Sequence, residues 1–154
     1  MISEDDRKMI EAAAARFPAR RAAALEALQI VQKSRGWVSD EDLRSAADLL
    51  GMGAAELDAL ASFYPLVFRK PVGRHVILVC DSICCWIQGH ETILDRLVSR
   101  LGIRLGETDP EGRFTLLPSA CLGACDHAPA MMIDGDLHVD LTPAGLDAIL
   151  ERYG

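Results

Sequence analysis

The sequence predicts an α+β protein, in which an N-terminal helical bundle is followed by a second domain built on a four-stranded mixed sheet. The N-terminal half is rich in alanine and has apolar residues at helical spacing, whereas the C-terminal half has short apolar runs typical of strands. Between the two halves, Pro65, Pro71 and Gly73 interrupt the helical pattern. We therefore expect two domains, at residues 1–68 and 72–154.

Each helix of the N-terminal domain is predicted from a start signal or a stop signal. Ser3 and Ser39 are each followed by three acidic residues, which is typical of a helix N-cap. Pro18 and Gly36 are expected to end the first and second helices, and Gly51 the third. The first predicted helix begins at Ser3, and the second runs from about 19 to 33. The third begins at Ser39 and ends at Gly51, and the fourth runs from about 54 to 63.

The third and fourth predicted helices, separated by Gly51-Met52-Gly53, resemble a helix-turn-helix, so DNA binding is a hypothesis that the sequence raises. The would-be recognition helix contains Glu56 and Asp58 but no Lys or Arg. Because that helix would repel phosphates, and because the chain carries a net charge of -7, we expect no nucleic-acid partner. The helical domain is interpreted as a packing and docking bundle.

The C-terminal domain is predicted to contain short strands and helices in the order strand, helix, strand, strand, strand, helix. The first two strands are joined through a helix and should be parallel, while Asp134-Gly135 marks a hairpin turn between the last two. A βαβ unit followed by ββα is the thioredoxin-like arrangement. The expected ranges, in chain order, are about 75–80, 88–101, 114–118, 130–134, 137–140 and 143–152.

Four of the five cysteines form two pairs, Cys80 with Cys85 and Cys121 with Cys125. Each pair is predicted to lie in a short loop at the carboxyl end of one of the two parallel strands, so the loops are expected to share a metal site. Four thiolates suit either tetrahedral zinc or an iron–sulfur cluster. Because zinc sites more often use cysteines that are closer together in sequence, the cluster is the favoured interpretation.

Inert packing, disulfide bonding and thiol–disulfide exchange fit the cysteines less well than a metal site does. Buried free cysteines are often inert, but four cysteines paired in this way are seldom so. Disulfides are disfavoured because the cysteine count is odd and the acidic start lacks the features of a secretory signal, which indicates a reducing compartment. A thiol–disulfide oxidoreductase would use Cys-x-x-Cys, a spacing that the sequence does not contain.

The spacings Cys80-x4-Cys85 and Cys121-x3-Cys125 occur together with several longer stretches that make the pattern highly specific. These stretches are Ser62-Phe63-Tyr64, Pro71 to Ile77, Gly112 to Pro118, Cys121 to Asp126 and Met131 to Asp134. With them, the chain resembles over nearly its whole length the thioredoxin-like [2Fe-2S] subunit of the NADH dehydrogenase module of bacterial respiratory complex I.

The resemblance implies that Cys80, Cys85, Cys121 and Cys125 each give a thiolate to one [2Fe-2S] cluster, and that this chain has no catalytic site of its own. It also implies docking on a flavoprotein subunit that binds FMN and NADH, within a complex that holds further iron–sulfur subunits. Hydride would pass from NADH to FMN in that partner, and the cluster would take up one electron. Related subunits occur in NAD-linked formate dehydrogenases and bidirectional hydrogenases, so the owning complex stays open.

The same resemblance implies a cytoplasmic location at the inner face of the plasma membrane. No apolar segment approaches the roughly 20 residues that a membrane-spanning helix needs, so we expect no direct membrane insertion. Membrane association is therefore expected to come through the complex. A zinc-binding interaction module and a free-standing ferredoxin remain as alternative functions.

One departure from the family pattern is Cys84, which precedes Cys85 where the pattern has a single cysteine. Position and spacing favour Cys85 as the ligand. Cys84 is then expected to pack inertly, with substitution for a damaged ligand as the alternative.

The predicted site lacks positive charge nearby in sequence, since residues 75–95 and 114–150 contain no Lys or Arg. Asp81 and Asp126 adjoin the predicted ligands. Reduction adds negative charge to a cluster, so we expect a low reduction potential. Gly123 is expected to let backbone N–H groups approach a cysteine sulfur closely, with an ordinary turn as the alternative.

Overall fold

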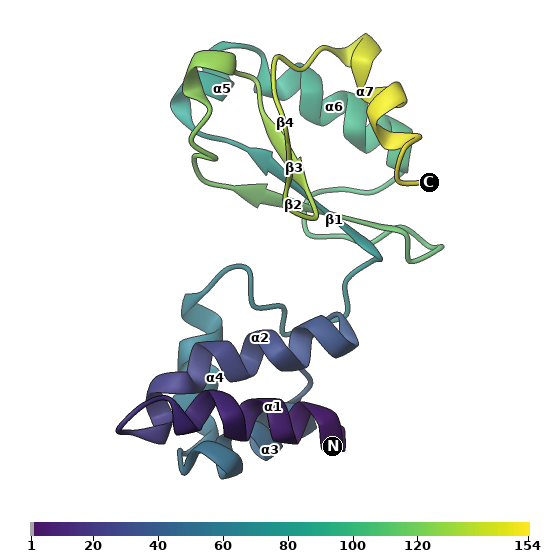
Figure 1. Cartoon of the computed structure of the whole chain (residues 1–154). Helices are drawn as coiled ribbons and strands as arrows, with labels where there is room; N and C mark the ends of the chain where they lie inside the picture. The colour runs from purple at the N-terminus through teal and green to yellow at the C-terminus, as the bar shows by residue number, and fades with distance from the viewer. Residues whose placement is uncertain (1) are drawn as a thin grey trace. The chain divides into compact units, whose positions relative to one another are not determined.

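The computed structural model describes residues 2–154 and divides the chain into two compact units, one that reaches Pro71 and one that spans Val72–Gly154 (Figure 1). The break falls within the segment where Pro65, Pro71 and Gly73 interrupt the helical pattern. In the described part of the chain, no helix is both long and apolar enough to cross a membrane.

The N-terminal unit is helical, as the sequence predicts. Ser3 and Ser39 act as N-caps, because each side chain accepts a hydrogen bond from the backbone N–H three residues later. The predicted second helix begins differently from the prediction, since its first turn is a 3-10 helix that becomes α-helical only at Ala24. The elements are α1 (Glu4–Ala15), η1 (Arg20–Ala23), α2 (Ala24–Arg35), α3 (Asp40–Leu50) and α4 (Ala54–Phe63).

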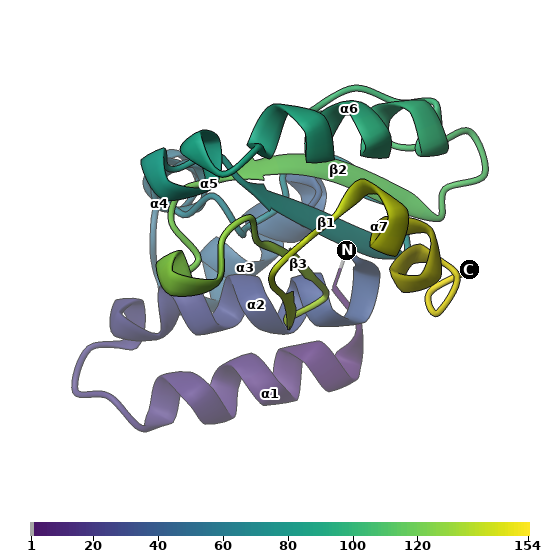
Figure 2. The same ribbon diagram turned by 90° about the horizontal axis from the view of Figure 1, so that it is seen from above.

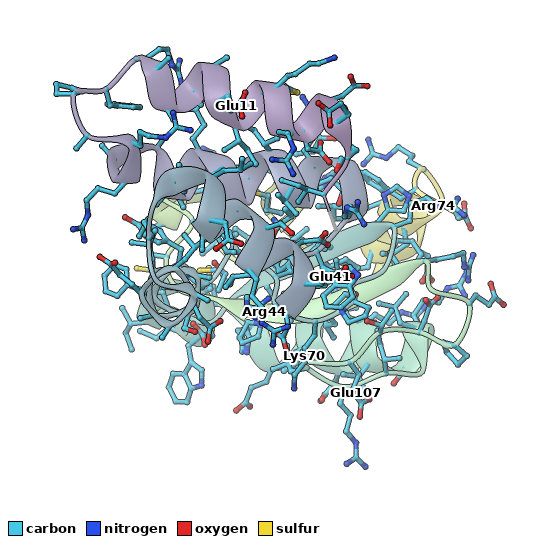
Figure 3. All side chains as sticks on the ribbon, turned by 90° about the horizontal axis from the view of Figure 1, so that it is seen from below. Glu11, Glu41, Arg44, Lys70, Arg74 and Glu107 are labelled. Atoms are coloured by element: carbon cyan, nitrogen blue, oxygen red, sulfur yellow. The ribbon has the colours of Figure 1, made fainter. Side chains whose placement is uncertain are left out.

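The core of this unit is assembled from small side chains and a few large ones. Ala27 and Ala46 are fully buried beside Leu28, which allows the helices to approach one another closely. Charged residues such as Glu11 and Arg44 are exposed and extend away from the ribbon (Figure 3). The alanine-rich composition therefore specifies a tightly packed bundle.

The C-terminal unit is a four-stranded mixed sheet in the order β2-β1-β3-β4. β1 pairs with β2 in parallel, and β3 pairs with both β1 and β4 in antiparallel fashion, so the predicted strand directions are confirmed. The helices α6 and α7 pack against each other and cover one face of the sheet (Figures 1 and 2). The elements are β1 (His75–Cys80), α5 (Ile83–Ile87), α6 (His90–Leu101), β2 (Phe114–Ser119), η2 (Cys125–His127), β3 (Met131–Ile133), β4 (Asp136–His138) and α7 (Pro143–Leu150).

Several boundaries in this unit differ from the sequence-based expectation. The short helix α5 was not predicted, and the helix expected from residue 88 begins at His90. The last helix, expected to reach residue 152, ends at Leu150. Strands β3 and β4 are shorter than predicted. The hairpin turn uses Asp134 and Gly135, both at positive φ, so β3 ends at Ile133 and β4 begins at Asp136, one residue earlier than expected. At its other end β4 stops at His138, before Asp140, which also has a positive φ.

The pairing of β1 with β2 depends on a close backbone approach at Gly73. A Cβ atom at this position would lie 2.9 Å from backbone atoms of Arg113 and Phe114. The Gly73 N–H also donates a 2.6 Å hydrogen bond to the buried Thr115 hydroxyl. Glycine is required here because any side chain would push β1 away from β2.

We expect Gly73→Ala to lower the free energy of unfolding by about 2 kcal/mol, since forcing extra volume against packed atoms costs about 1–3 kcal/mol. Urea denaturation of the full chain, followed by circular dichroism, measures this loss. The control is Gly53→Ala, because a Cβ atom there meets nothing within 4 Å. Equal stability of the two variants would contradict the explanation.

Candidate metal centre

The parallel pairing of β1 and β2 brings the two cysteine segments to one edge of the sheet. Cys80 is the last residue of β1 and lies opposite Ser119, the last residue of β2. Cys121 follows Ser119 by two residues. The sequence prediction that both segments lie at the carboxyl ends of parallel strands is therefore confirmed.

The local structure around the cysteines differs from the two loops that the sequence indicated. Cys80 lies within β1, Cys85 lies in the short helix α5, and Cys125 begins the 3-10 turn η2. Only Cys121 lies in an irregular segment. Strand and helix hold Cys80 and Cys85 by backbone hydrogen bonds, so these two positions are more firmly placed than loop residues.

Cys80 and Cys85 form a buried pair, each only 2% exposed. Their thiols interact with each other, and the backbone N–H of Ala130 favours the thiolate form of Cys85. Burial, together with the interaction with Cys80, raises the pKa of the Cys85 thiol. A metal ion would have to displace the protons of this pair to bind it.

Cys121 and Cys125 form an exposed pair, with their Sγ atoms 3.3 Å apart. Two sulfurs bound to one tetrahedral metal at about 2.3 Å lie about 3.8 Å apart, so this separation suits a shared metal ion after a small adjustment. The Gly123 N–H donates to the Cys121 Sγ at 3.3 Å, and Gly123 has a φ of +84°. The expectation that Gly123 brings an N–H group to sulfur is confirmed.

The two thiols of the exposed pair have opposite acid–base behaviour. The Gly123 N–H, followed by the hydrogen bond with Cys125, lowers the pKa of Cys121. The interactions of Cys125 with Cys121 and with Cys84 raise its pKa to about 12. The first thiolate in this pair is therefore favoured, and the second is disfavoured unless a positive charge such as a metal ion compensates it.

Cys84 lies closer to the site than the sequence indicated. It is partly buried on α5, and its thiol interacts with Cys125 of the other segment, which helps to raise the pKa of Cys125. An interaction between residues 41 positions apart leaves no signal in the local sequence. Among residues 2–154, no three or more Cys, His, Asp or Glu side chains are gathered into a single group able to hold a metal ion.

His90 is a neighbour of the site to which the sequence assigned no role. It is 8% exposed, and its Nδ1 donates a 2.9 Å hydrogen bond to the Cys80 carbonyl. This bond ties the first turn of α6 to the end of β1. The His127 side chain, by contrast, is exposed, and its Nδ1 lies 3.0 Å from an Asp140 carboxylate oxygen.

The donor set fits a [2Fe-2S] cluster, because each of its two irons takes only two protein thiolates and so needs no group of three side chains around one ion. The protein supplies two pairs of sulfurs, one from each segment, and a backbone hydrogen bond reaches one sulfur of each pair. Paired thiolates with N–H donors directed at the sulfurs are the environment in which such clusters are held.

Comparison with known proteins agrees with this chemistry. Residues 10–154 match the profile of the thioredoxin-like [2Fe-2S] ferredoxin family. The chain is 49% identical to the E subunit of NADH-quinone oxidoreductase from Pseudomonas aeruginosa, covering 99% of this chain and 92% of the relative. Identity to the E subunit from Escherichia coli is also 49%, with the same coverage of 99% and 92%.

A solved NAD+-reducing [NiFe]-hydrogenase in its H2-reduced state has the same fold, with a TM-score of 0.74 and 27% sequence identity. The match covers 85% of this chain but only 22% of the hydrogenase chain, which is therefore much longer. The extent of the profile match and the high identity over nearly full-length relatives settle the family. The chain belongs to the thioredoxin-like [2Fe-2S] ferredoxin family, together with the E subunits of NADH-quinone oxidoreductase.

Proposed function

We propose that this chain is an electron-transfer subunit of an NADH-quinone oxidoreductase, with Cys80, Cys85, Cys121 and Cys125 as the ligands of one [2Fe-2S] cluster. The observation that carries the proposal is the β1–β2 register, which sets Cys80 opposite Ser119 and so brings both cysteine pairs to one edge of the sheet. The corresponding subunit of an NAD+-reducing hydrogenase is the second candidate. The 49% identity to E subunits favours the first over the 27% identity to the hydrogenase.

The cluster, when bound, supplies one-electron chemistry. The residues of this chain hold it and set its surroundings. The buried Cys80–Cys85 pair is fixed by β1 and α5 and is shielded from water, while the Cys121–Cys125 pair is exposed. The N–H groups near Cys85 and Cys121 stabilise negative charge on sulfur.

The proposed partner is an FMN-binding subunit that oxidises NADH, accompanied by further iron–sulfur subunits of the same complex. Catalysis then belongs to the assembly. The location proposed for the chain is the cytoplasmic face of the plasma membrane, reached through the complex and not by insertion. Co-purification with the flavoprotein subunit would separate this function from that of a free-standing ferredoxin.

Purified full-length chain should contain two iron and two sulfide ions per molecule and should be red-brown, because four thiolates then hold a [2Fe-2S] cluster. Iron, sulfide and zinc analysis with a visible absorption spectrum measures this. A colourless protein with one zinc ion would support the zinc-binding module and contradict the proposal.

Substitution of the adjacent cysteines tests the ligand assignment. Cys85→Ser should lose most of its iron, because the buried sulfur beside Cys80 is removed. Cys84→Ser is the matched control and should keep the iron content of the unmodified chain. Iron loss in the Cys84 variant alone would show that the assignment is wrong.

The midpoint potential should lie near or below about −400 mV, the range of plant-type ferredoxins. The reason is charge: Asp126 beside Cys125 is 80% exposed, and residues 75–95 and 114–150 contain no Lys or Arg. Potentiometry monitored by EPR on the isolated full chain gives the value. A midpoint near −150 mV or higher, where histidine-ligated clusters begin, would contradict the expectation.

A further inference from the structure

The helix α5 exposes a strip of large apolar side chains directly beside the cysteines. Of its five residues, Cys85 is buried beside Cys80 and is only 2% exposed. The three large residues at helical spacing i, i+3 and i+4 are instead turned outward. These residues, called the α5 strip below, are Ile83 at 64% exposure, Trp86 at 56% and Ile87 at 69%.

Both faces of this one short helix are therefore apolar. Single exposed apolar residues are ordinary on protein surfaces, but a contiguous group with tryptophan at its centre is typical of a surface that another protein covers. None of the three residues belongs to the hydrophobic clusters formed by the described residues of either unit. The α5 strip is thus unused by the fold of this chain.

The rim of the α5 strip is acidic. Asp81 precedes α5 and is exposed, and Glu91 follows it in the first turn of α6 and is exposed too. Asp126 directly follows Cys125, the residue with which Cys84 interacts, and its side chain is 80% exposed. Residues 75–95 and 114–150, which contain these three carboxylates, have no Lys or Arg. The imidazole of His127, the next residue in sequence, lies 3.6 Å from the Asp126 carboxylate.

The position of α5 relates the strip to electron transfer. Cys85 lies on α5 and packs in one buried cluster with Cys80. The Cys84 thiol on the same helix interacts with Cys125, so α5 lies near both cysteine segments. The rate of electron tunnelling falls steeply with distance. A redox partner must therefore cover this edge of the sheet, and the α5 strip lies where it would make contact.

We propose that the α5 strip is the docking surface for the FMN-binding subunit, and that Trp86 enters an apolar pocket of that subunit rimmed by Lys or Arg. This rests on the function proposed above. A basic rim complements the acidic surroundings of the strip, steers the encounter and orients the two proteins. A second copy of this chain does not fit as well, because a symmetric contact would bring Asp81 and Asp126 against carboxylates of the other copy.

Binding of the cluster-loaded full chain to the FMN-binding subunit from the same organism tests the proposal. Trp86→Ser should weaken the equilibrium affinity at least about 30-fold, the effect of removing a central interface residue. Ile87→Ser is a second variant, in case the first disturbs the cluster, and should weaken affinity about tenfold. The matched control is Leu137→Ser on β4, an apolar residue that is 45% exposed and should change affinity less than about threefold.

The acidic rim is tested by kinetics. Asp81→Asn combined with Asp126→Asn should slow association several-fold at low salt and reduce its dependence on ionic strength. If neither the association rate nor its dependence on ionic strength changes, the proposal that Lys or Arg residues rim the partner's pocket is wrong.

Each result of the binding assay supports or overturns a defined statement. Unchanged affinity of both strip variants, with normal iron content, would overturn the docking surface while leaving the proposed function intact. Failure of the unmodified chain to bind the FMN-binding subunit would overturn both. Sedimentation showing a dimer that Trp86→Ser dissociates would assign the strip to self-association and overturn the proposal as well.

Discussion

The site depends above all on the parallel pairing of β1 with β2. Six consecutive residue pairs, from His75 opposite Phe114 to Cys80 opposite Ser119, fix where the two strands end. A slip of one residue would turn Cys80 to the other face of the sheet. The close approach at Gly73 sets this register at one end of the strands, and the cysteines lie at the other. A glycine far from the sulfurs therefore helps to position them.

The two cysteine pairs lie at the same edge of the sheet but in different environments. One pair is buried and held by a strand and a helix, and the other is exposed on a loop and a 3-10 turn. Negative charge on the buried pair is costly unless metal and hydrogen bonds compensate it. The exposed pair is the side that solvent or a partner protein can reach. This asymmetry gives the site a protected interior and a contact edge.

The helix α5 holds Cys85, a proposed ligand, yet the sequence pattern did not predict this helix. Five residues, two of them β-branched isoleucines, are too few to show a reliable helical period. The signal that was present is Ser82 at the N-cap position, followed by apolar residues at 83, 86 and 87. The same three apolar residues form the exposed α5 strip.

The sequence by itself determined the strand directions and the two cysteine pairs, because these follow from local patterns, namely apolar runs and cysteine spacing. It left the role of Gly123 open between an N–H donor to sulfur and an ordinary turn, and the structure decided for the donor. Only the tertiary structure decided which sulfurs are buried, that Cys84 interacts with Cys125, and that His90 holds the end of β1. Those facts arise from segments far apart in sequence that pack together. Burial and contact are properties of that packing, and no local pattern encodes them.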